Sequence, residues 1–217
     1  MRLYTYFRSS AAFRVRIALN LKGLAYESAF VHLPKGEHRK PEYATLNPQA
    51  LVPALLDDGH LLTQSLAIME YLDDIKPQPR LLPEDARERA YARSLALMTI
   101  ADVHPLTVPR VRKHLAKTFG ADADAIEAWG AHWTAEGLAA YERFLGRRRP
   151  SPFALGKDVG IADICIAGQV VGAQYVKIDL GAFALVKELS DRLFKLPEFS
   201  SSHPFEQPDY KASGAKH

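Results

Sequence analysis

Residues 6–14 of the chain read YFRSSAAFR, residues 47–55 read NPQALVPAL, and residues 63–68 read TQSLAI. The first and third stretches place hydroxyl or amide side chains where a strand pattern gives way to a helix pattern. A helix N-terminus offers unpaired N–H groups and the positive end of a dipole, so it is suited to holding an anion. In the middle stretch, Pro53 restricts the backbone. Two such helix starts flanking a proline turn predict a site for a small, multiply anionic peptide.

Strand and helix patterns alternate around these stretches. The expected elements are a strand at 3–7, a helix at 11–24, a strand at 26–31, an irregular, partly helical loop at 32–43, a hairpin at 54–62 and a helix at 64–75. The hairpin rests on the turn-forming sequence Asp-Asp-Gly at 57–59. The order β-α-β followed by β-β-α is thioredoxin-like, and it ends at a proline-rich linker at 76–79.

The remainder of the chain favours helix. The expected segments are a long amphipathic stretch at 84–115, bent near Pro105 and Pro109, then helices at 125–145, 161–175 and 182–193, and an extended tail from Ser200. The sequence therefore predicts an α+β thioredoxin-like N-terminal domain at 1–80. An all-α C-terminal domain follows at 81–217.

The overall composition is that of a globular protein and gives no sign of a nucleic-acid-binding or membrane-spanning chain. The chain has 217 residues, of which 47% are hydrophobic and 24% charged, and a formal net charge of only +3, so we expect an ordinary soluble protein with no nucleic-acid partner. No apolar run is long enough to span a membrane, and the first residues lack an apolar signal core. The single cysteine, Cys165, excludes an intrachain disulfide and multi-cysteine metal sites, and we expect it to be a small buried hydrophobe in a cytoplasmic protein.

The three stretches, in this order, resemble the N-terminal domain of the glutathione transferases. The run SSAAFRVRIAL at residues 9–19 resembles their zeta class, which includes maleylacetoacetate and maleylpyruvate isomerases. The resemblance continues nearly to the C-terminus. It implies glutathione as the cofactor, a small acidic or electrophilic substrate and a homodimer.

Ser9 and Ser10 lie between the first strand and the first helix. A free thiol has a pKa near 8.5, so only a small fraction is thiolate at neutral pH. A hydroxyl donor at the positive end of a helix stabilises the thiolate form. Serines also cap helices well, which is the structural alternative. The resemblance assigns the thiolate role to the first serine, Ser9, with Ser10 as the alternative donor.

Two further stretches carry the expected binding residues. The resemblance implies a cis peptide bond between Val52 and Pro53, with the main chain of Val52 pairing with the cysteinyl part of glutathione. It also implies that Ser65, with Gln64 beside it, binds the γ-glutamyl carboxylate. A trans proline at the edge of a strand and a plain helix cap are the respective alternatives.

Four cationic or titratable residues complete the expected site. The resemblance suggests that His38, in the irregular loop, reaches the glycyl end of glutathione. From its place on the bent helical stretch, we also expect His104 to contact glutathione, with a helix-packing histidine as the alternative. No second ligand at helical spacing supports a metal site there. A dicarboxylate substrate needs cationic partners, and arginine binds carboxylates with two prongs. Arg8 and Arg110 are the expected acid-binding residues, with surface salt bridges as the alternative.

Three departures from the family pattern bear on the second substrate. Ala11 replaces a cysteine that usually follows the serine pair, Tyr175 stands where an arginine is expected, and residues 107–109 read TVP where relatives tend to have two asparagines. A helix-start motif at 160–163 has Gly160 at the cap, and we interpret Asp163 as structural.

The leading hypothesis is a glutathione-dependent cis–trans isomerase of a maleyl dicarboxylate. A conjugating or dehalogenating transferase and a non-catalytic binding protein remain the alternatives.

Overall fold

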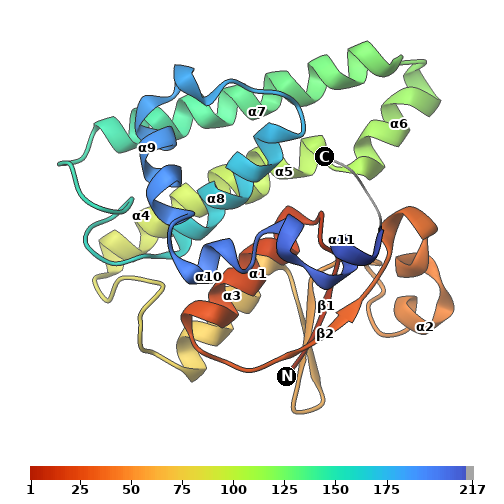
Figure 1. Ribbon diagram of the computed structural model, residues 1–217, viewed down its shortest axis with the longest axis horizontal. Helices are drawn as coiled ribbons and strands as arrows, with labels where there is room; N and C mark the ends of the chain where they lie inside the picture. The colour runs from red at the N-terminus through yellow and green to blue at the C-terminus, as the bar shows by residue number, and fades with distance from the viewer. Residues whose placement is uncertain (214–217) are drawn as a thin grey trace. The chain divides into compact units, whose positions relative to one another are not determined.

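The computed structural model describes residues 1–213, which form two compact units. The first unit combines Met1–Leu81 with the segment that begins at Phe194, and the second is Leu82–Leu193. Figure 1 labels their α-helices and the strands β1 and β2. Each unit is described by itself below.

The first unit is built on a four-stranded sheet. Its strands are β1 (Arg2–Thr5), β2 (Glu27–Phe30), β3 (Ala54–Asp57) and β4 (His60–Thr63), in the order β2-β1-β3-β4. β1 pairs with β2 in parallel, whereas the other two pairs are antiparallel. Asp58 and Gly59, both at positive φ, join β3 to β4 as the turn sequence predicted. The α+β thioredoxin-like prediction is therefore confirmed.

Two helices pack together in this unit and supply much of its core. α1 (Ser10–Leu21) and α3 (Ser65–Ile75) bury apolar side chains that include Phe13, Ile17, Ile68 and Leu72. Between β2 and β3 the chain forms the short turns η1 (Leu33–Lys35) and η2 (Glu37–Arg39) and the helix α2 (Pro41–Ala44). This agrees with the irregular, partly helical loop expected from its prolines and glycine.

The C-terminal segment differs from its sequence-based prediction. It is not extended, since it forms α10 (Pro197–Ser200), η5 (Pro204–Glu206) and α11 (Pro208–Ser213). Each element begins with a proline, which suits the first helical position because its missing N–H needs no partner there. The segment also groups with the first unit, whereas residues 81–217 were expected to form one helical domain. The segment groups with the first unit because α1 offers it an apolar surface. Phe13 of α1 makes aromatic contacts with Phe194 and His203.

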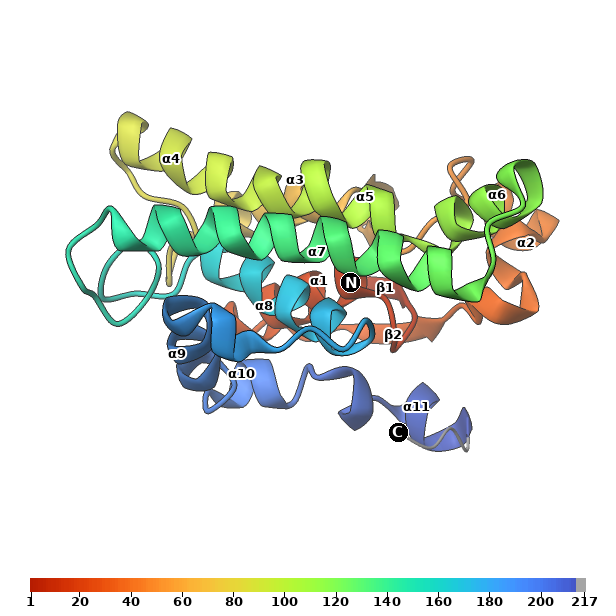
Figure 2. The same cartoon turned by 90° about the horizontal axis from the view of Figure 1, so that it is seen from above.

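The second unit is helical throughout its main elements. They are α4 (Ala86–Leu97), α5 (His104–Thr107), α6 (Pro109–Phe119), α7 (Ala123–Gly146), α8 (Ile161–Gln174) and α9 (Ala184–Leu193), with a 3₁₀ turn η4 (Leu180–Ala182). α7 runs beside the α4–α5 stretch (Figure 2). None of the helices described in residues 1–213 is long and apolar enough to span a lipid bilayer.

The predicted bend in the long helical stretch has two parts. A π-helical segment, η3 (Met98–Val103), lies directly before Pro105 and continues into α5. The wider turn accommodates a proline that lacks an N–H and crowds the preceding turn. The true break is at Val108, whose backbone is extended as is usual before a proline, here Pro109.

The start of α8 is held by one buried carboxylate. Asp163 accepts hydrogen bonds from the N–H of Gly160 at 2.9 Å and from the N–H of Ala154 at 2.8 Å. Burial raises the pKa of Asp163 to about 6, although these N–H donors oppose the shift. The structural role predicted for Asp163 is confirmed, as is the buried position of Cys165 on the same helix.

Candidate active site

Three segments that carry predicted site residues leave the sheet at one edge. Tyr4 of β1 pairs with Ala54 of β3, and Ala54 also pairs with Thr63 of β4. Because β1 and β4 both run antiparallel to β3, the end of β1, the start of β3 and the end of β4 lie together. The segments that continue from these ends carry Ser9, Val52 and Ser65.

Ser9 is the N-cap of α1. Its Oγ accepts a hydrogen bond from the N–H of Ala12 at 3.2 Å, and its own N–H donates to the carbonyl of Tyr6. A hydroxyl has two lone pairs and one proton, so capping leaves the proton available for a further acceptor. Ser10 is the first residue of α1 and, like Ser9, is half-buried. Helix capping is therefore observed at Ser9, and it is compatible with the predicted thiolate contact.

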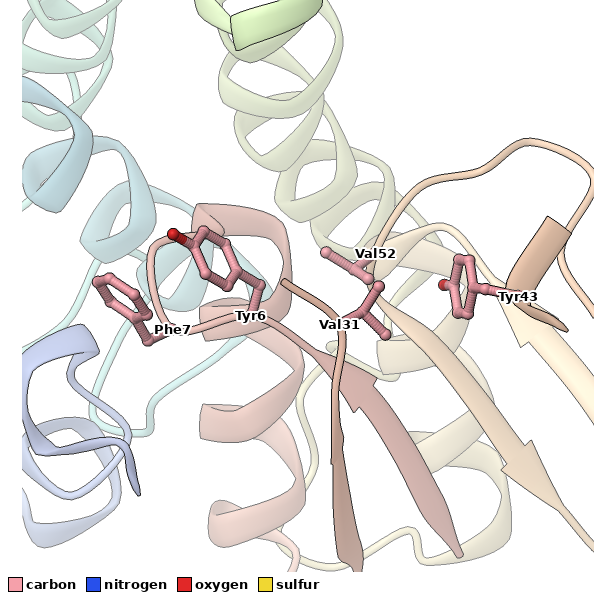
Figure 3. Packing of buried hydrophobic residues seen from close by; sticks show 5 residues of the cluster. All are labelled: Tyr6, Phe7, Val31, Tyr43 and Val52. Atoms are coloured by element: carbon pink, nitrogen blue, oxygen red, sulfur yellow. The ribbon is translucent and has the colours of Figure 1, made fainter. Parts of the chain in front are cut away.

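Val52 presents its main chain at the sheet edge. The peptide bond between Val52 and Pro53 is cis, as expected. Val52 is only 8% exposed, yet within residues 1–213 neither its N–H nor its carbonyl forms a hydrogen bond. Buried main-chain groups are nearly always paired, so this edge offers one donor and one acceptor to an extended peptide. Its side chain packs in a cluster seen in Figure 3, which also contains Tyr6, Phe7, Val31 and Tyr43.

The loop before Val52 is held in place by two side chains. The Tyr43 hydroxyl and the Asn47 amide both donate to the carbonyl of Leu51, at 2.6 and 2.8 Å. Burial raises the pKa of Tyr43, and the Asn47 hydrogen bond partly offsets that rise, so the phenol stays protonated as a donor. The main chain of Val52 is thus presented by a rigid loop.

The start of α3 has the features of an anion site. Its N-cap, Gln64, has φ 69° and makes no side-chain cap, and the first helical hydrogen bond is donated by the N–H of Ile68. Within the described chain, the N–H groups of Ser65, Leu66 and Ala67 therefore have no partner. A non-glycine residue at such a positive φ is strained, and strain of this kind gathers at functional sites. The Gln64 amide also bonds to Gln49 at 2.9 Å, which ties this helix start to the Val52 loop.

Arg14 adds positive charge beneath this helix start. Its guanidinium is almost completely buried, and its Nη1 donates to Ser65 Oγ at 2.9 Å. Because the guanidinium occupies a lone pair of Ser65, the Ser65 hydroxyl proton points to a different acceptor. Sequence analysis did not identify Arg14 as a site residue. The available signal was a pair of arginines, Arg14 and Arg16, within an otherwise apolar helix, where arginine is rarely buried without a polar partner.

The remaining predicted residues are divided between the units. Arg8 is exposed in the loop after β1, and His38 is half-buried in η2, so both belong to the first unit with Ser9, Val52 and Ser65. His104 is half-buried at the start of α5, and Arg110 is exposed in the first turn of α6, in the second unit. The participation of these four residues in one site stays a prediction.

Comparisons with known proteins agree with this geometry. A family model described as the N-terminal domain of glutathione S-transferase matches residues 1–74. A maleylacetoacetate isomerase from Pseudomonas aeruginosa is 42% identical over 98% of this chain and 100% of its own length.

Two solved structures extend the agreement to three dimensions. A maleylpyruvate isomerase, described as a bacterial zeta-class glutathione transferase in its holo form, has a TM-score of 0.93 with 42% identity, covering 96% of this chain and 99% of its own. A maleylacetoacetate isomerase from Methylobacterium extorquens, with malonate and glutathione bound, has the same TM-score and identity, covering 96% and 98%. The fold is that of a glutathione transferase. The chain belongs to the zeta class of that family, the maleylacetoacetate and maleylpyruvate isomerases.

Proposed function

We propose that this protein is a glutathione-dependent cis–trans isomerase of a maleyl dicarboxylate, either maleylacetoacetate or maleylpyruvate. The observation that carries the proposal is the convergence of Ser9, Val52 and Ser65 at one sheet edge. Relatives that share about two fifths of the sequence over nearly the whole chain are isomerases of this kind.

The donors and acceptors at this edge fit glutathione. Val52 offers an N–H and a carbonyl to the cysteinyl residue, and the start of α3, with Ser65 and the buried Arg14, suits the γ-glutamyl carboxylate. Ser9 keeps a hydroxyl proton for the sulfur while its oxygen caps α1. Bound glutathione supplies a thiolate, whose reversible addition to a double bond converts a forbidden rotation into an easy one.

The chain's own residues then have separate tasks. The Ser9 hydroxyl and the N-terminus of α1 favour the ionised sulfur, with a preference of about 2.7 kcal/mol needed to lower a thiol pKa by about two units. Arg8 and Arg110 bind the substrate carboxylates, and His38 and His104 contact glutathione. Malonate, a small dicarboxylate, is bound in one of the similar structures, which supports an acidic second ligand.

A conjugating or dehalogenating transferase is the second candidate. Two positions favour it, because the family pattern has a cysteine and an arginine there. They are Ala11, half-buried in the first turn of α1, and Tyr175, the C-cap that follows α8. Both departures bear on the second substrate, and both leave Ser9, Val52 and Ser65 in place.

One assay separates these functions. Purified protein is mixed with glutathione and maleylpyruvate, maleylacetoacetate or a haloacid, while free thiol and double-bond absorbance are recorded together. An isomerase changes the absorbance of a maleyl substrate at constant thiol, whereas a transferase consumes thiol in proportion to product. Absence of both changes with every substrate would favour the binding protein.

We further propose that the protein is a cytoplasmic homodimer. The cytoplasm maintains the reduced glutathione pool that such a reaction requires. The dimer is proposed on the family relationship alone.

A further inference from the structure

The loop that carries Ser9 is held at Phe7 from two sides. The N–H of Phe7 donates to Asp209 Oδ2 at 2.7 Å, and its carbonyl accepts from Arg16 Nη2 at 3.3 Å. The Phe7 ring also contacts the Tyr210 ring, with centroids 5.3 Å apart. Asp209 and Tyr210 both lie in α11, about two hundred positions along the chain from the loop.

The C-terminal segment is itself anchored to α1. Arg16 Nε donates to the carbonyl of Ser202 at 3.1 Å, and the Asn20 amide donates to Ser202 Oγ at 2.8 Å. Within the segment, the Gln207 amide bonds to the carbonyls of Ser201 and His203. These hydrogen bonds hold the segment that carries Asp209 against α1.

The hydrogen bond from the Phe7 N–H is the main contact of the Asp209 carboxylate, with smaller favourable influences from the nearby charge of Arg16 and from the N–H groups of Asp209 and Tyr210. The second carboxylate oxygen, Oδ1, is buried and forms no hydrogen bond within residues 1–213. Burial raises the pKa of Asp209, and the hydrogen bond from the Phe7 N–H is the largest influence that lowers it. A charged acceptor binds a main-chain N–H about twice as strongly as a neutral one, so this contact holds the Phe7 peptide firmly.

We propose that Asp209 is a positioning residue for the Ser9 loop, and this role rests on the function proposed above. Phe7 is two residues from Ser9 and adjacent to Arg8, so a shift of the Phe7 peptide moves both. Small displacements matter because a hydroxyl stabilises a developing or resident charge only at hydrogen-bond distance. The C-terminal segment thereby sets the geometry of a site formed by the first residues of the chain.

The test uses the full-length protein and three variants: Asp209→Ala, Asp209→Asn and, as a matched control, Glu206→Ala. Glu206 lies in the same segment, but its carboxylate pairs with Lys211 on the surface at 3.1 Å. The measurements are hydrogen exchange of the Phe7 amide without glutathione, the pKa of the thiol of bound glutathione from its thiolate absorbance, and glutathione affinity by calorimetry.

We expect Asp209→Ala to expose the Phe7 amide to about tenfold faster exchange and to raise the thiol pKa by about half a unit to one unit, with affinity within about twofold of wild type. Asp209→Asn retains an acceptor oxygen, so it should lie between Asp209→Ala and wild type in both measurements. Glu206→Ala should match wild type.

Two outcomes would overturn the role of Asp209. The first is an unchanged thiol pKa in Asp209→Ala while wild type lowers it below the free value of about 8.5. The second is a loss of glutathione affinity in Asp209→Ala that is fully explained by a lower free energy of unfolding of that variant. Failure of the wild-type protein to lower the thiol pKa would refute the proposed function itself, whatever the Phe7 amide does.

Discussion

At the scale of single residues, Ser9 combines two tasks that use different parts of one hydroxyl. Its oxygen accepts the N–H of Ala12 and so caps α1, while its proton remains for a second acceptor. The same reasoning applies to Ser65, whose oxygen accepts from Arg14. In both places a neighbouring donor binds the oxygen, and the hydroxyl proton remains available to a further acceptor.

Replacement of Ser9 by alanine tests the thiolate role. We expect Ser9→Ala to lower kcat by roughly 10²–10³, by analogy with loss of one oxyanion donor. Loss of the cap should lower the free energy of unfolding by only about 1 kcal/mol. Ser10→Ala is the matched control, measured by the same kinetics and urea denaturation. Near-normal activity in Ser9→Ala with loss in Ser10→Ala would assign the role to Ser10.

Ser65 and Arg14 are expected to affect binding more than turnover. Ser65→Ala should weaken glutathione affinity more than it lowers kcat. Arg14→Gln should weaken glutathione binding about ten- to a hundredfold, because it removes a charge-assisted contact. It should hardly change the affinity for an analogue that lacks the γ-glutamyl α-carboxylate. Calorimetry below the variant's melting temperature compares the two peptides, and equal losses would mean that Arg14 supports only the fold.

At the scale of elements, the start of α8 gives the second unit a pH dependence. Asp163 titrates at about 6 when folded, above its usual value of 3.8. The folded state therefore binds more protons than the unfolded state between these values, and the stability contributed by this group falls as the pH rises from about 4 to about 6.

An Asp163→Asn variant isolates this effect. Relative to the variant, the free energy of unfolding of the wild-type protein should fall by up to about 1.4 kcal/mol per pH unit within that window. Above about pH 6 the free energy of unfolding relative to the variant should no longer change with pH. The measurement is urea denaturation of both proteins between pH 4 and 7. A difference independent of pH would contradict a raised pKa for Asp163.

At the scale of the whole molecule, the proposed binding of a dicarboxylate substrate requires positive charge on the protein. Tyr175 carries no positive charge, so we expect the proposed carboxylate contacts to come from Arg8 and Arg110. Loss of one charge-assisted carboxylate contact costs about 1.5–3 kcal/mol, roughly ten- to a hundredfold in kcat/KM.

Arg110→Ala should accordingly reduce kcat/KM for maleylpyruvate by that factor and leave a neutral electrophile nearly unaffected. Lys113→Ala, which removes an exposed cation from the same helix, is the control. Equal losses on both substrates would indicate that Arg110 supports the fold or glutathione binding. An unchanged rate on both would shift the assignment to a general transferase.

The assembly is testable on the same scale. Sedimentation at micromolar concentration should give twice the chain mass of 24.1 kDa. A monomer under those conditions would contradict the proposed dimer.

The sequence by itself determined the local elements and the identity of three site segments. The hairpin followed from Asp58 and Gly59, and the start of α1 followed from Ser9 and Ser10, because caps and turns are stabilised by atoms only a few residues apart. The cis bond before Pro53 was implied by the family resemblance and not by the dipeptide alone.

Only the tertiary structure decided which of these pieces meet. The register of β1, β3 and β4 brings the three segments to one edge, Arg14 reaches Ser65 across 51 positions, and Asp209 reaches Phe7 across 202. The tail from Ser200 was wrongly expected to be extended, because its prolines, Pro204 and Pro208, also suit the starts of short helices. Such contacts are absent from local patterns, since a buried guanidinium or carboxylate finds its partner only after the packing of distant elements has removed water from both.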